Sequence, residues 1–303
     1  AMSGGVDSSV AAALLVREGH DVVGVTMRLW GGDSDTGCCS VADVEDARRV
    51  AQQLHIDHLV FTFTEDFDRH VVDPYVRDHA AGTTPNPCIE CNRHLKFDRL
   101  AERADVLGFD AVATGHHARI EHVDGRLRLA RGADRRKDQS YVVHMLDQAA
   151  LARTLFPVGR YASKADLRAL AADLGLRTAS KPDSQDVCFI SSTKGRSWFL
   201  ERRIPMTPAR VVDTSGAPLG EVPAVQLVTI GQRKGLGLAG GGPKRFVVDV
   251  DRSTSTVTLG EESDLLCDKL RAVGVTWSDE PVNGDVLVQT SALRPFRPPV
   301  SKR

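Results

Sequence analysis

Apolar residues in the first half of the chain alternate between helical spacing and short continuous runs. A first helix is predicted by four apolar residues that recur at helical intervals, Val6, Val10, Leu14 and Leu15. Gly19 follows where a C-cap glycine is expected. The next segment, residues 22–29, is almost continuously apolar, which is typical of a strand buried on both faces.

The alternation of strand and helix continues to about residue 174. The further elements expected are, in chain order, a helix over 41–54 capped by Ser40, a β-rich run over 58–64, a helix over 66–80, a buried strand over 110–118, and a helix over 163–174 that opens with the capping-box pattern of Ser163 and Asp166. Repeated units of this kind predict an α/β fold with a doubly wound parallel sheet, in which ligands bind at the carboxyl ends of the strands. The loop before the first helix, Met27 and Gly115 all fall at such ends.

Beyond about residue 200 the pattern changes to short β-rich runs separated by turns, at 209–213, 246–250 and 256–259. Such spacing predicts one or two small β domains. The sequence begins at Ala1 inside a predicted strand, and its last segment, 285–303, completes no sheet. We therefore expect that the natural chain has been cut at both ends.

Composition narrows the class of protein. The 303 residues are 42% hydrophobic and 26% charged, an ordinary balance for a soluble globular protein. No apolar run approaches the roughly 20 residues that span a bilayer, and no signal peptide precedes the first strand, so we expect no membrane partner. Six cysteines without a secretory segment favour functional thiols in the reducing cytoplasm over a disulfide scaffold. With a net charge of −1, the protein could hold a nucleic acid only through a local basic patch.

The first candidate site is the loop Ser3-Gly4-Gly5-Val6-Asp7-Ser8-Ser9, between a strand and a helix. Its glycines let the backbone approach a ligand, and the helix start presents N–H groups and a positive dipole end to an anion. The Gly-Lys-Ser/Thr ending of a kinase-type P-loop is missing. A turn without a ligand is the alternative, but three hydroxyls around the glycines favour a pyrophosphate-binding loop. The run resembles the SGGxDS signature of the PP-loop ATP pyrophosphatases.

The second candidate site is a set of cysteines. Cys88 and Cys91 form a Cys-x-x-Cys motif in a segment whose prolines, Pro85 and Pro87, predict a rigidly presented loop, and Cys188 follows much later. A structural zinc site would need a further ligand pair that the chain does not supply, and inert cysteines are uncommon in a polar loop. Redox or sulfur chemistry fits best. The remaining cysteines, Cys38, Cys39 and Cys267, are expected to be structural or incidental.

Six motifs follow one another along the chain. They are the Ser-Gly-Gly loop, Thr84-Pro85-Asn86-Pro87 with Cys91-Asn92, Ala-Thr-Gly-His ending at His116, Lys137-Asp138-Gln139-Ser140-Tyr141, Asp183-Ser184 before Cys188-Phe189-Ile190, and Thr-Ile-Gly-Gln-Arg-Lys-Gly-Leu-Gly from Thr229. In this order the chain resembles the tRNA-specific 2-thiouridylases of the MnmA type, from residue 1 to about 260. The resemblance implies a PP-loop adenylation domain at 1–196, a small central β-rich domain at 197–262 and an incomplete C-terminal β-barrel segment at 263–303.

The resemblance also implies a reaction, in which ATP adenylates the 2-oxygen of the wobble uridine of tRNA and sulfur replaces that oxygen. Cys188 would carry the sulfur as a persulfide, supplied by a sulfur carrier or a cysteine desulfurase. Cys91 would free the sulfur by attacking the persulfide and forming a disulfide with Cys188. The implied ATP contacts are Ala1, Met2, Ser3, Gly4, Gly5, Val6, Asp7, Ser8, Met27 and Gly115, with Mg²⁺ on the phosphates and Asp7 as its expected ligand.

The tRNA contacts are implied in the same way. The resemblance places Asn86, Pro87 and Cys88 at the target base and His116, Lys137, Asp138 and Gln139 at other parts of the tRNA. Five arginines lie just before Lys137, namely Arg126, Arg128, Arg131, Arg135 and Arg136. A solvated face is one interpretation of this stretch, and a patch for the RNA backbone is the other.

Two departures from the family pattern leave alternatives open. Many members have Asp where this chain has Cys88, so that Cys88, Cys91 and Cys188 could instead hold a 4Fe–4S cluster that carries sulfide. Ser291 stands where the family places an arginine, and no tRNA role is assigned there. Two other classes also remain: a PP-loop synthetase or amidotransferase-type enzyme, which needs neither Cys91 nor Cys188, and a nucleotide-binding regulator, which needs no basic stretch either.

Overall fold

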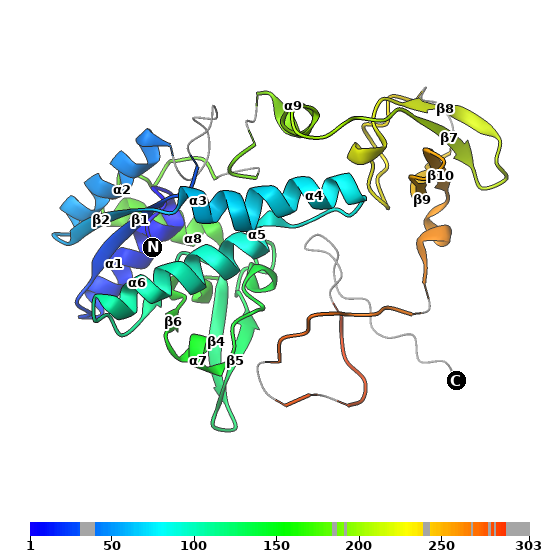
Figure 1. The fold of residues 1–303 in the computed structure, drawn as a ribbon. Helices are drawn as coiled ribbons and strands as arrows, with labels where there is room; N and C mark the ends of the chain where they lie inside the picture. The colour runs from blue at the N-terminus through cyan, green and yellow to red at the C-terminus, as the bar shows by residue number, and fades with distance from the viewer. Residues whose placement is uncertain are drawn as a thin grey trace.

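The computed structural model describes residues 1–30, 40–183, 187–190, 193–238, 243–267, 269–277, 280–281 and 283–288. Figure 1 shows a larger α/β part, built from the chain before α9 (Gly195–Glu201), and a smaller β part, connected to it through α9. In the described segments, no helix combines the length and apolar character that crossing a bilayer requires.

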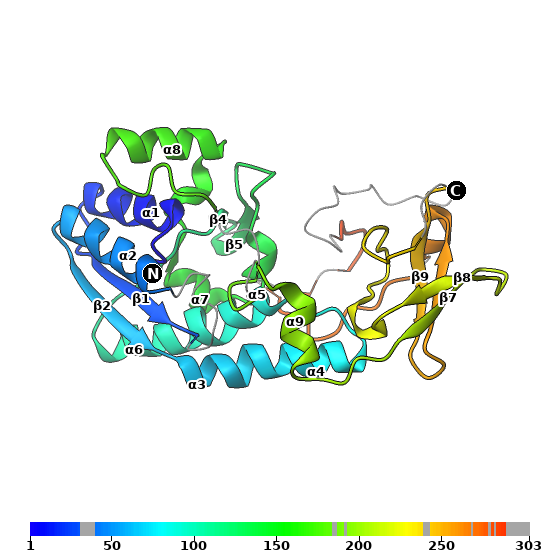
Figure 2. The same cartoon turned by 90° about the horizontal axis from the view of Figure 1, so that it is seen from above.

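The larger part contains α1 (Val6–Arg17), β1 (Val23–Arg28), α2 (Val41–Gln53), β2 (Asp57–Thr62), α3 (Thr64–Phe67), the π-helix η1 (Asp68–Val72), α4 (Asp73–Ala81), α5 (Pro87–Glu90), the π-helix η2 (Cys91–Arg99), α6 (Leu100–Val106), β3 (Val112–Ala113), β4 (Ala118–Val123), β5 (Arg126–Arg131), the 3₁₀ helix η3 (Ser140–Val142), α7 (Gln148–Ala152), β6 (Thr154–Leu155), the 3₁₀ helix η4 (Pro157–Arg160) and α8 (Lys164–Asp173). Strands β1 and β2 pair in parallel, as do β3 and β6. Helices α1, α2 and α8 lie on one side of these strands and α3 and α6 on the other (Figure 2). This arrangement confirms the predicted α/β fold.

Local capping explains two of the predicted helices. The Ser40 hydroxyl accepts a hydrogen bond from the Asp43 N–H at 3.1 Å, and the Ser163 hydroxyl accepts one from the Asp166 N–H at the same distance. Each bond satisfies a donor that the helix itself leaves unpaired. The predicted strand over 110–118 is divided: Val112–Ala113 form β3, and after a bend at His117 the chain enters the β4–β5 hairpin at Ala118.

The smaller part is one sheet in the order β8-β7-β10-β9, made of β7 (Ala209–Asp213), β8 (Pro218–Val222), β9 (Phe246–Asp251) and β10 (Thr256–Gly260), with the 3₁₀ helices η5 (Val225–Leu227) and η6 (Glu262–Leu265). Its core is formed by fully buried valines, among them Val211, Val247 and Val257. The Arg252 guanidinium donates to the carbonyls of His79 and Ala80, at 3.0 and 2.7 Å, and so attaches this sheet to the end of α4. In the expected barrel segment over 263–303, the described residues include the end of η6 and form no strand.

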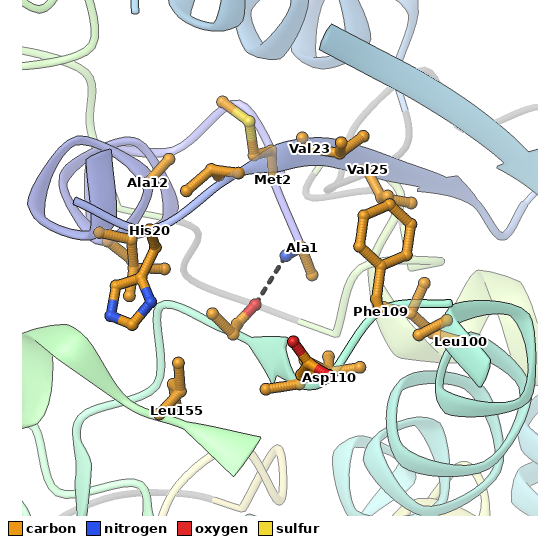
Figure 3. A pocket seen from close by; sticks show the side chains of 18 of the residues that line it. Ala1, Met2, Ala12, His20, Val23, Val25, Leu100, Phe109, Asp110 and Leu155 are labelled. Atoms are coloured by element: carbon orange, nitrogen blue, oxygen red, sulfur yellow. Dashed lines mark hydrogen bonds between the residues drawn. The ribbon is translucent and has the colours of Figure 1, made fainter. Parts of the chain in front are cut away.

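Ala1 and Met2 join the two pairs of parallel strands. The Met2 N–H donates to the Val25 carbonyl of β1 at 2.7 Å, and the Ala1 amino group donates to the Ala113 carbonyl of β3 at 2.6 Å. The strands therefore follow one another as β2, β1, residues 1–2, β3 and β6. A cavity of about 470 Å³ lies beside Ala1, between β1 and β3 (Figure 3). Most of the residues that line it are of apolar type, among them Ala12 of α1 and Leu100 of α6.

The shape of this cavity generates a prediction about stability. Because it is bounded by two parallel strands, an added strand would find unpaired backbone groups on both sides and apolar side chains above and below. We expect a Val-Ile-Val-Val extension ahead of Ala1 to raise the free energy of unfolding, since each fully buried side chain of this type contributes about 1.5–3 kcal/mol. Urea unfolding measures the change. A Gly-Ser-Gly-Ser extension is the control, and equal stabilisation by both would contradict the prediction.

The same extension changes how stability depends on pH. Burial, with repulsion from the Lys96 ammonium, lowers the pKa of the Ala1 amino group from 8.0 to about 5. Between these values the unfolded chain binds more protons than the folded one, so the contribution of this group to stability rises with pH. We expect the chain that begins at Ala1 to gain stability from pH 5 to pH 8. The Val-Ile-Val-Val form should lose that increment, because its ammonium lies outside the cavity.

Candidate active site

The loop before α1 is held in a shape that needs glycine. Gly4 has a φ of +70°, and a Cβ built there would lie 2.3 Å from the Asp43 carbonyl oxygen. The Ser8 and Ser9 hydroxyls donate to the Gly5 carbonyl at 3.1 and 2.8 Å. Gly5 is the N-cap of α1 and provides no side-chain cap, so the first N–H groups of this 12-residue helix remain available to an anion.

Gly115, two residues after β3, packs against the backbone of this loop. A Cβ at Gly115 would lie 2.7 Å from the Ser8 nitrogen and 2.8 Å from the Asp7 carbonyl carbon. Backbone therefore packs directly on backbone, and the loop sits at the carboxyl end of the strands as the sequence predicts.

A cavity of about 330 Å³ opens beside the loop and contains most of the residues expected at the site. Its lining includes Ala1, Met2, Ser3, Asp7, Ser8, Met27, Pro87, Cys88, Cys91, Gly115, His116, Gln139 and Cys188. Six expected contacts lie outside the lining, namely Gly4, Gly5, Val6, Asn86, Lys137 and Asp138. Of these, Val6 is buried in the hydrophobic core against which α1 packs. The structure thus brings the glycine loop and the three cysteines, which are far apart in sequence, to one cavity.

The expectation that Cys88 and Cys91 lie in a loop was wrong. Residues Pro87–Glu90 form α5, and Cys91 opens the π-helix η2. The Asn86 side chain accepts from the Cys88 N–H at 3.1 Å, and Pro87 occupies the first helical turn. Asparagine at the N-cap followed by proline is a common helix start, so the signal was present in the sequence. Cys88 is exposed, whereas Cys91 is buried and Cys188 half-buried.

An ion-pair network that the sequence did not reveal lies next to the loop. The Lys164 ammonium at the start of α8 contacts the Asp7 carboxylate and lies 3.2 Å from Asp183. Asp183 also binds Lys137 at 2.9 Å and Arg168 at 2.8 Å. Burial alone would raise the pKa of Asp183, but the Lys137 hydrogen bond and the Lys164 charge together lower it to about 2. Both carboxylates are therefore ionised at neutral pH and bound to cations.

This network bears on the expected Mg²⁺ ligand. The Asp7 carboxylate is already engaged by Lys164 and accepts from His117 Nε2 at 3.1 Å. Burial opposes these bonds, but together they lower the pKa of Asp7. A metal at Asp7 would compete with the Lys164 ammonium for the same carboxylate, so Asp7 as a Mg²⁺ ligand stays a prediction, and no step below depends on it.

Asp138 and Gln139 are occupied by their own surroundings. One Asp138 oxygen accepts from the N–H groups of Gly132 and Ser140, at 3.0 and 3.1 Å. The Gln139 side-chain oxygen accepts from the His117 N–H at 2.9 Å. These bonds hold the segment after β5 against the end of β3. A contact of either side chain with tRNA stays a prediction.

His116 is buried and neutral. Burial, followed by the charge of Lys96, lowers the pKa of His116 well below its usual range. Its Nδ1 lies 2.7 Å from the Thr114 hydroxyl and its Nε2 lies 3.5 Å from the Lys96 nitrogen. The ring is 7% exposed, so its expected tRNA contact would have to be made through the cavity.

The iron–sulfur alternative finds no support in the geometry. Among the residues that the structure describes, no group of three or more His, Cys, Asp or Glu side chains is arranged to hold a metal ion. Some residues that the sequence analysis names lie outside the described residues. They are Cys38, Cys39, Ser184 and the stretch 289–292.

The chain is similar in sequence to known proteins over most of its length. Residues 1–192 match the family described as the tRNA methyl transferase HUP domain, and residues 197–261 match the tRNA methyl transferase PRC-barrel domain. The tRNA-specific 2-thiouridylase MnmA of Roseiflexus sp. (strain RS-1) is 45% identical, over 96% of this chain and 85% of its own length. The proteins of the same name from Carboxydothermus hydrogenoformans and Symbiobacterium thermophilum are 47% and 48% identical, over 92% and 91% of this chain and 79% and 74% of their own lengths.

The HUP match and the glycine loop define a nucleotide-binding protein of the PP-loop superfamily. Within that superfamily, the chain belongs to the MnmA family of tRNA-specific 2-thiouridylases. The family membership confirms the resemblance that the six motifs indicated.

The packing at Gly115 generates a second prediction. A methyl group there would push against the Asp7–Ser8 backbone, which moves with the loop and the start of α1. We expect Gly115→Ala to raise the KM for ATP about tenfold or more, because phosphate binding depends on the loop position. Gly108→Ala is the control: its φ of +79° strains the backbone, but its Cβ meets nothing within 4 Å. The control should lower the melting temperature without changing the KM, and an unchanged KM for Gly115→Ala would refute the prediction.

Proposed function

We propose that this protein uses ATP to replace the 2-oxygen of the wobble uridine of tRNA with sulfur, which Cys188 carries as a persulfide. The observation that supports this function best is a single cavity lined by the glycine loop and by both Cys91 and Cys188. The coarser activity, thiolation of a tRNA uridine by a PP-loop enzyme, follows from the family. We further propose the domain division 1–196, 197–262 and 263–303 and a location in the cytoplasm.

The first step is adenylation. The uridine 2-oxygen attacks the α-phosphorus of ATP, the bond from that phosphorus to the bridging oxygen breaks, and pyrophosphate leaves, while the proton on uridine N3 passes to solvent. The uncapped N–H groups at the start of α1 face the pyrophosphate. The Lys164 ammonium offsets the negative charge of the ionised Asp7 carboxylate and so reduces its repulsion of the phosphates.

The second step moves sulfur. The Cys91 thiolate attacks the Cys188 sulfur of the persulfide, the sulfur–sulfur bond breaks, and hydrosulfide leaves as a Cys91–Cys188 disulfide forms. Hydrosulfide then attacks uridine C2, and the carbon–oxygen bond breaks with its electron pair going to AMP. A dithiol reductant must reduce the disulfide before a sulfur carrier or a cysteine desulfurase reloads Cys188.

The residues of the site also distinguish thiolation from other reactions. The matched families carry the description of a methyl transferase, but methyl transfer needs neither a pyrophosphate loop nor paired thiols. An amide-forming PP-loop enzyme would also leave Cys91 and Cys188 without a task. Mass analysis of the tRNA nucleosides distinguishes the products, because exchange of oxygen for sulfur and addition of a methyl group shift the mass differently.

The cysteine assignments generate a third prediction. With ATP, a persulfide-donating sulfur source, a dithiol reductant and unmodified tRNA, we expect the native chain to form 2-thiouridine. Cys91→Ser and Cys188→Ser should each lower the rate by at least about 100-fold, because each removes a sulfur that exchanges in the reaction. The exposed Cys267→Ser is the matched control and should be fully active. Retained activity in either of these two variants would contradict the sulfur-transfer role assigned to that cysteine.

Cys88 separates the persulfide from the cluster route. The persulfide route requires Cys88→Ser and Cys88→Asp to keep activity and to copurify with no iron after anaerobic preparation. A cluster on three cysteines predicts the opposite, namely iron in the native chain and loss of both iron and thiolation in Cys88→Ser.

The basic stretch generates a fourth prediction. Arg135 and Arg136 are exposed in the turn after β5, directly before Lys137. If they contact the RNA backbone, Arg135→Gln/Arg136→Gln should weaken tRNA binding and reduce the salt dependence of log K by about one or two. Filter binding at several salt concentrations measures the slope. Arg77→Gln, on an exposed position of α4, is the matched control, and equal slopes for all three proteins would remove the stretch from the interface.

A further inference from the structure

Lys96 reaches the same cavity as the cysteines, although the reaction above gives it no task. It belongs to η2, a π-helix that begins at Cys91. Hydrogen bonds in a π-helix join residues i and i+5, so Cys91 and Lys96 lie one turn apart along the same side. An α-helix, with 3.6 residues per turn, would turn Lys96 away from Cys91. The π-helical winding therefore directs both side chains to the cavity, whose lining includes each of them.

Lys96 differs from the other lysines near the site in its ionic surroundings. Among the described residues, no carboxylate lies within ion-pair distance of it, in contrast to Lys137, Lys164 and Lys181. Lys96 is also the one lysine or arginine in the described lining of the cavity. A half-buried ammonium without a carboxylate leaves an incompletely neutralised charge, which an anionic ligand would compensate.

The neighbour that Lys96 does contact is a neutral acceptor. Because His116 Nε2 faces the Lys96 ammonium, it accepts, and the ring proton must then lie on Nδ1 and be donated to the Thr114 hydroxyl. The low pKa of His116 keeps this arrangement neutral. His116 therefore orients the ammonium without cancelling its charge.

Lys96 lies one π-helical turn from Cys91 and 3.5 Å from His116, which follows the glycine that packs on the loop, and this placement indicates which anion it meets. Pyrophosphate is expected at the start of α1, whereas the adenylated uridine must lie farther along the cavity, within reach of sulfur. We propose that Lys96 is a catalytic residue whose ammonium binds the phosphoryl group of the adenylated uridine and stabilises AMP as it leaves. This inference rests on the proposed thiolation.

The step balances without an added reactant. Hydrosulfide forms the bond to C2, and the C2–O bond breaks with its electron pair passing to the AMP oxygen. The hydrosulfide proton ends on N3 of the 2-thiouridine. Lys96 keeps its proton throughout, because its task is to stabilise the charge that develops on the phosphate.

The fifth prediction separates this role from adenylation. Lys96→Met keeps an unbranched stem of similar size but removes the charge. In a single turnover with tRNA, we expect the variant to release pyrophosphate within about twofold of the native rate and to release AMP and form 2-thiouridine about 100-fold or more slowly, the loss typical of one removed transition-state donor. Adenylated tRNA should accumulate. Lys96→Arg should recover part of the lost rate.

Two controls keep the outcomes distinct. Arg103→Gln removes a cation from an exposed position of α6, in the same helical run, and should leave all rates unchanged. Thermal melting of Lys96→Met tests folding directly. Native AMP release in Lys96→Met, or equal slowing of pyrophosphate release and AMP release, would overturn the inference. If the native protein itself releases pyrophosphate but forms no 2-thiouridine, the proposed function fails instead.

Discussion

The ion-pair network at Lys164 is the interaction on which the rest of the site depends. Asp7 belongs to the glycine loop, and Asp183 belongs to the segment that leads to Cys188, yet both carboxylates meet one ammonium at the start of α8. Removal of that ammonium would leave two partly buried carboxylates close together, an arrangement whose cost exceeds the small value of an exposed ion pair. The glycine loop and Asp183 are therefore held by the same charge.

Aromatic packing fixes Cys188 from its other side. Phe189 is 1% exposed, and its ring lies 5.2–5.6 Å from those of Phe67, Tyr75 and Phe199. Cys188 thus lies between a charged anchor at Asp183 and an apolar anchor at Phe189. In the proposed reaction, Cys91 must reach a persulfide on Cys188, and two anchors on either side of a half-buried cysteine restrict its position without burying the sulfur.

The sequence predicts those features of the structure that depend on contacts between residues close together in the chain. The caps at Ser40 and Ser163 depend on bonds to residues three positions away, and the sequence predicts both helices. The placement of Met27 and Gly115 followed from a general rule, since parallel strands end at one edge. Lys164 meets Asp7 across 157 positions, and neither composition nor spacing contains that pairing. The helix at Cys88 departs from the sequence prediction for a different reason, because Asn86 and Pro87 are common in loops and are also a common helix start.

The two lysines of the site show why equal charges have different tasks. Lys164 is bound by two carboxylates, which neutralise its charge. It therefore joins two protein segments and contributes little attraction for an anionic ligand. Lys96 faces a neutral imidazole, which accepts a hydrogen bond but supplies no charge. A carboxylate in place of His116 would bind Lys96 more strongly and cancel its field in the cavity. The burial that keeps His116 neutral is therefore what leaves one positive charge available where a phosphate must depart.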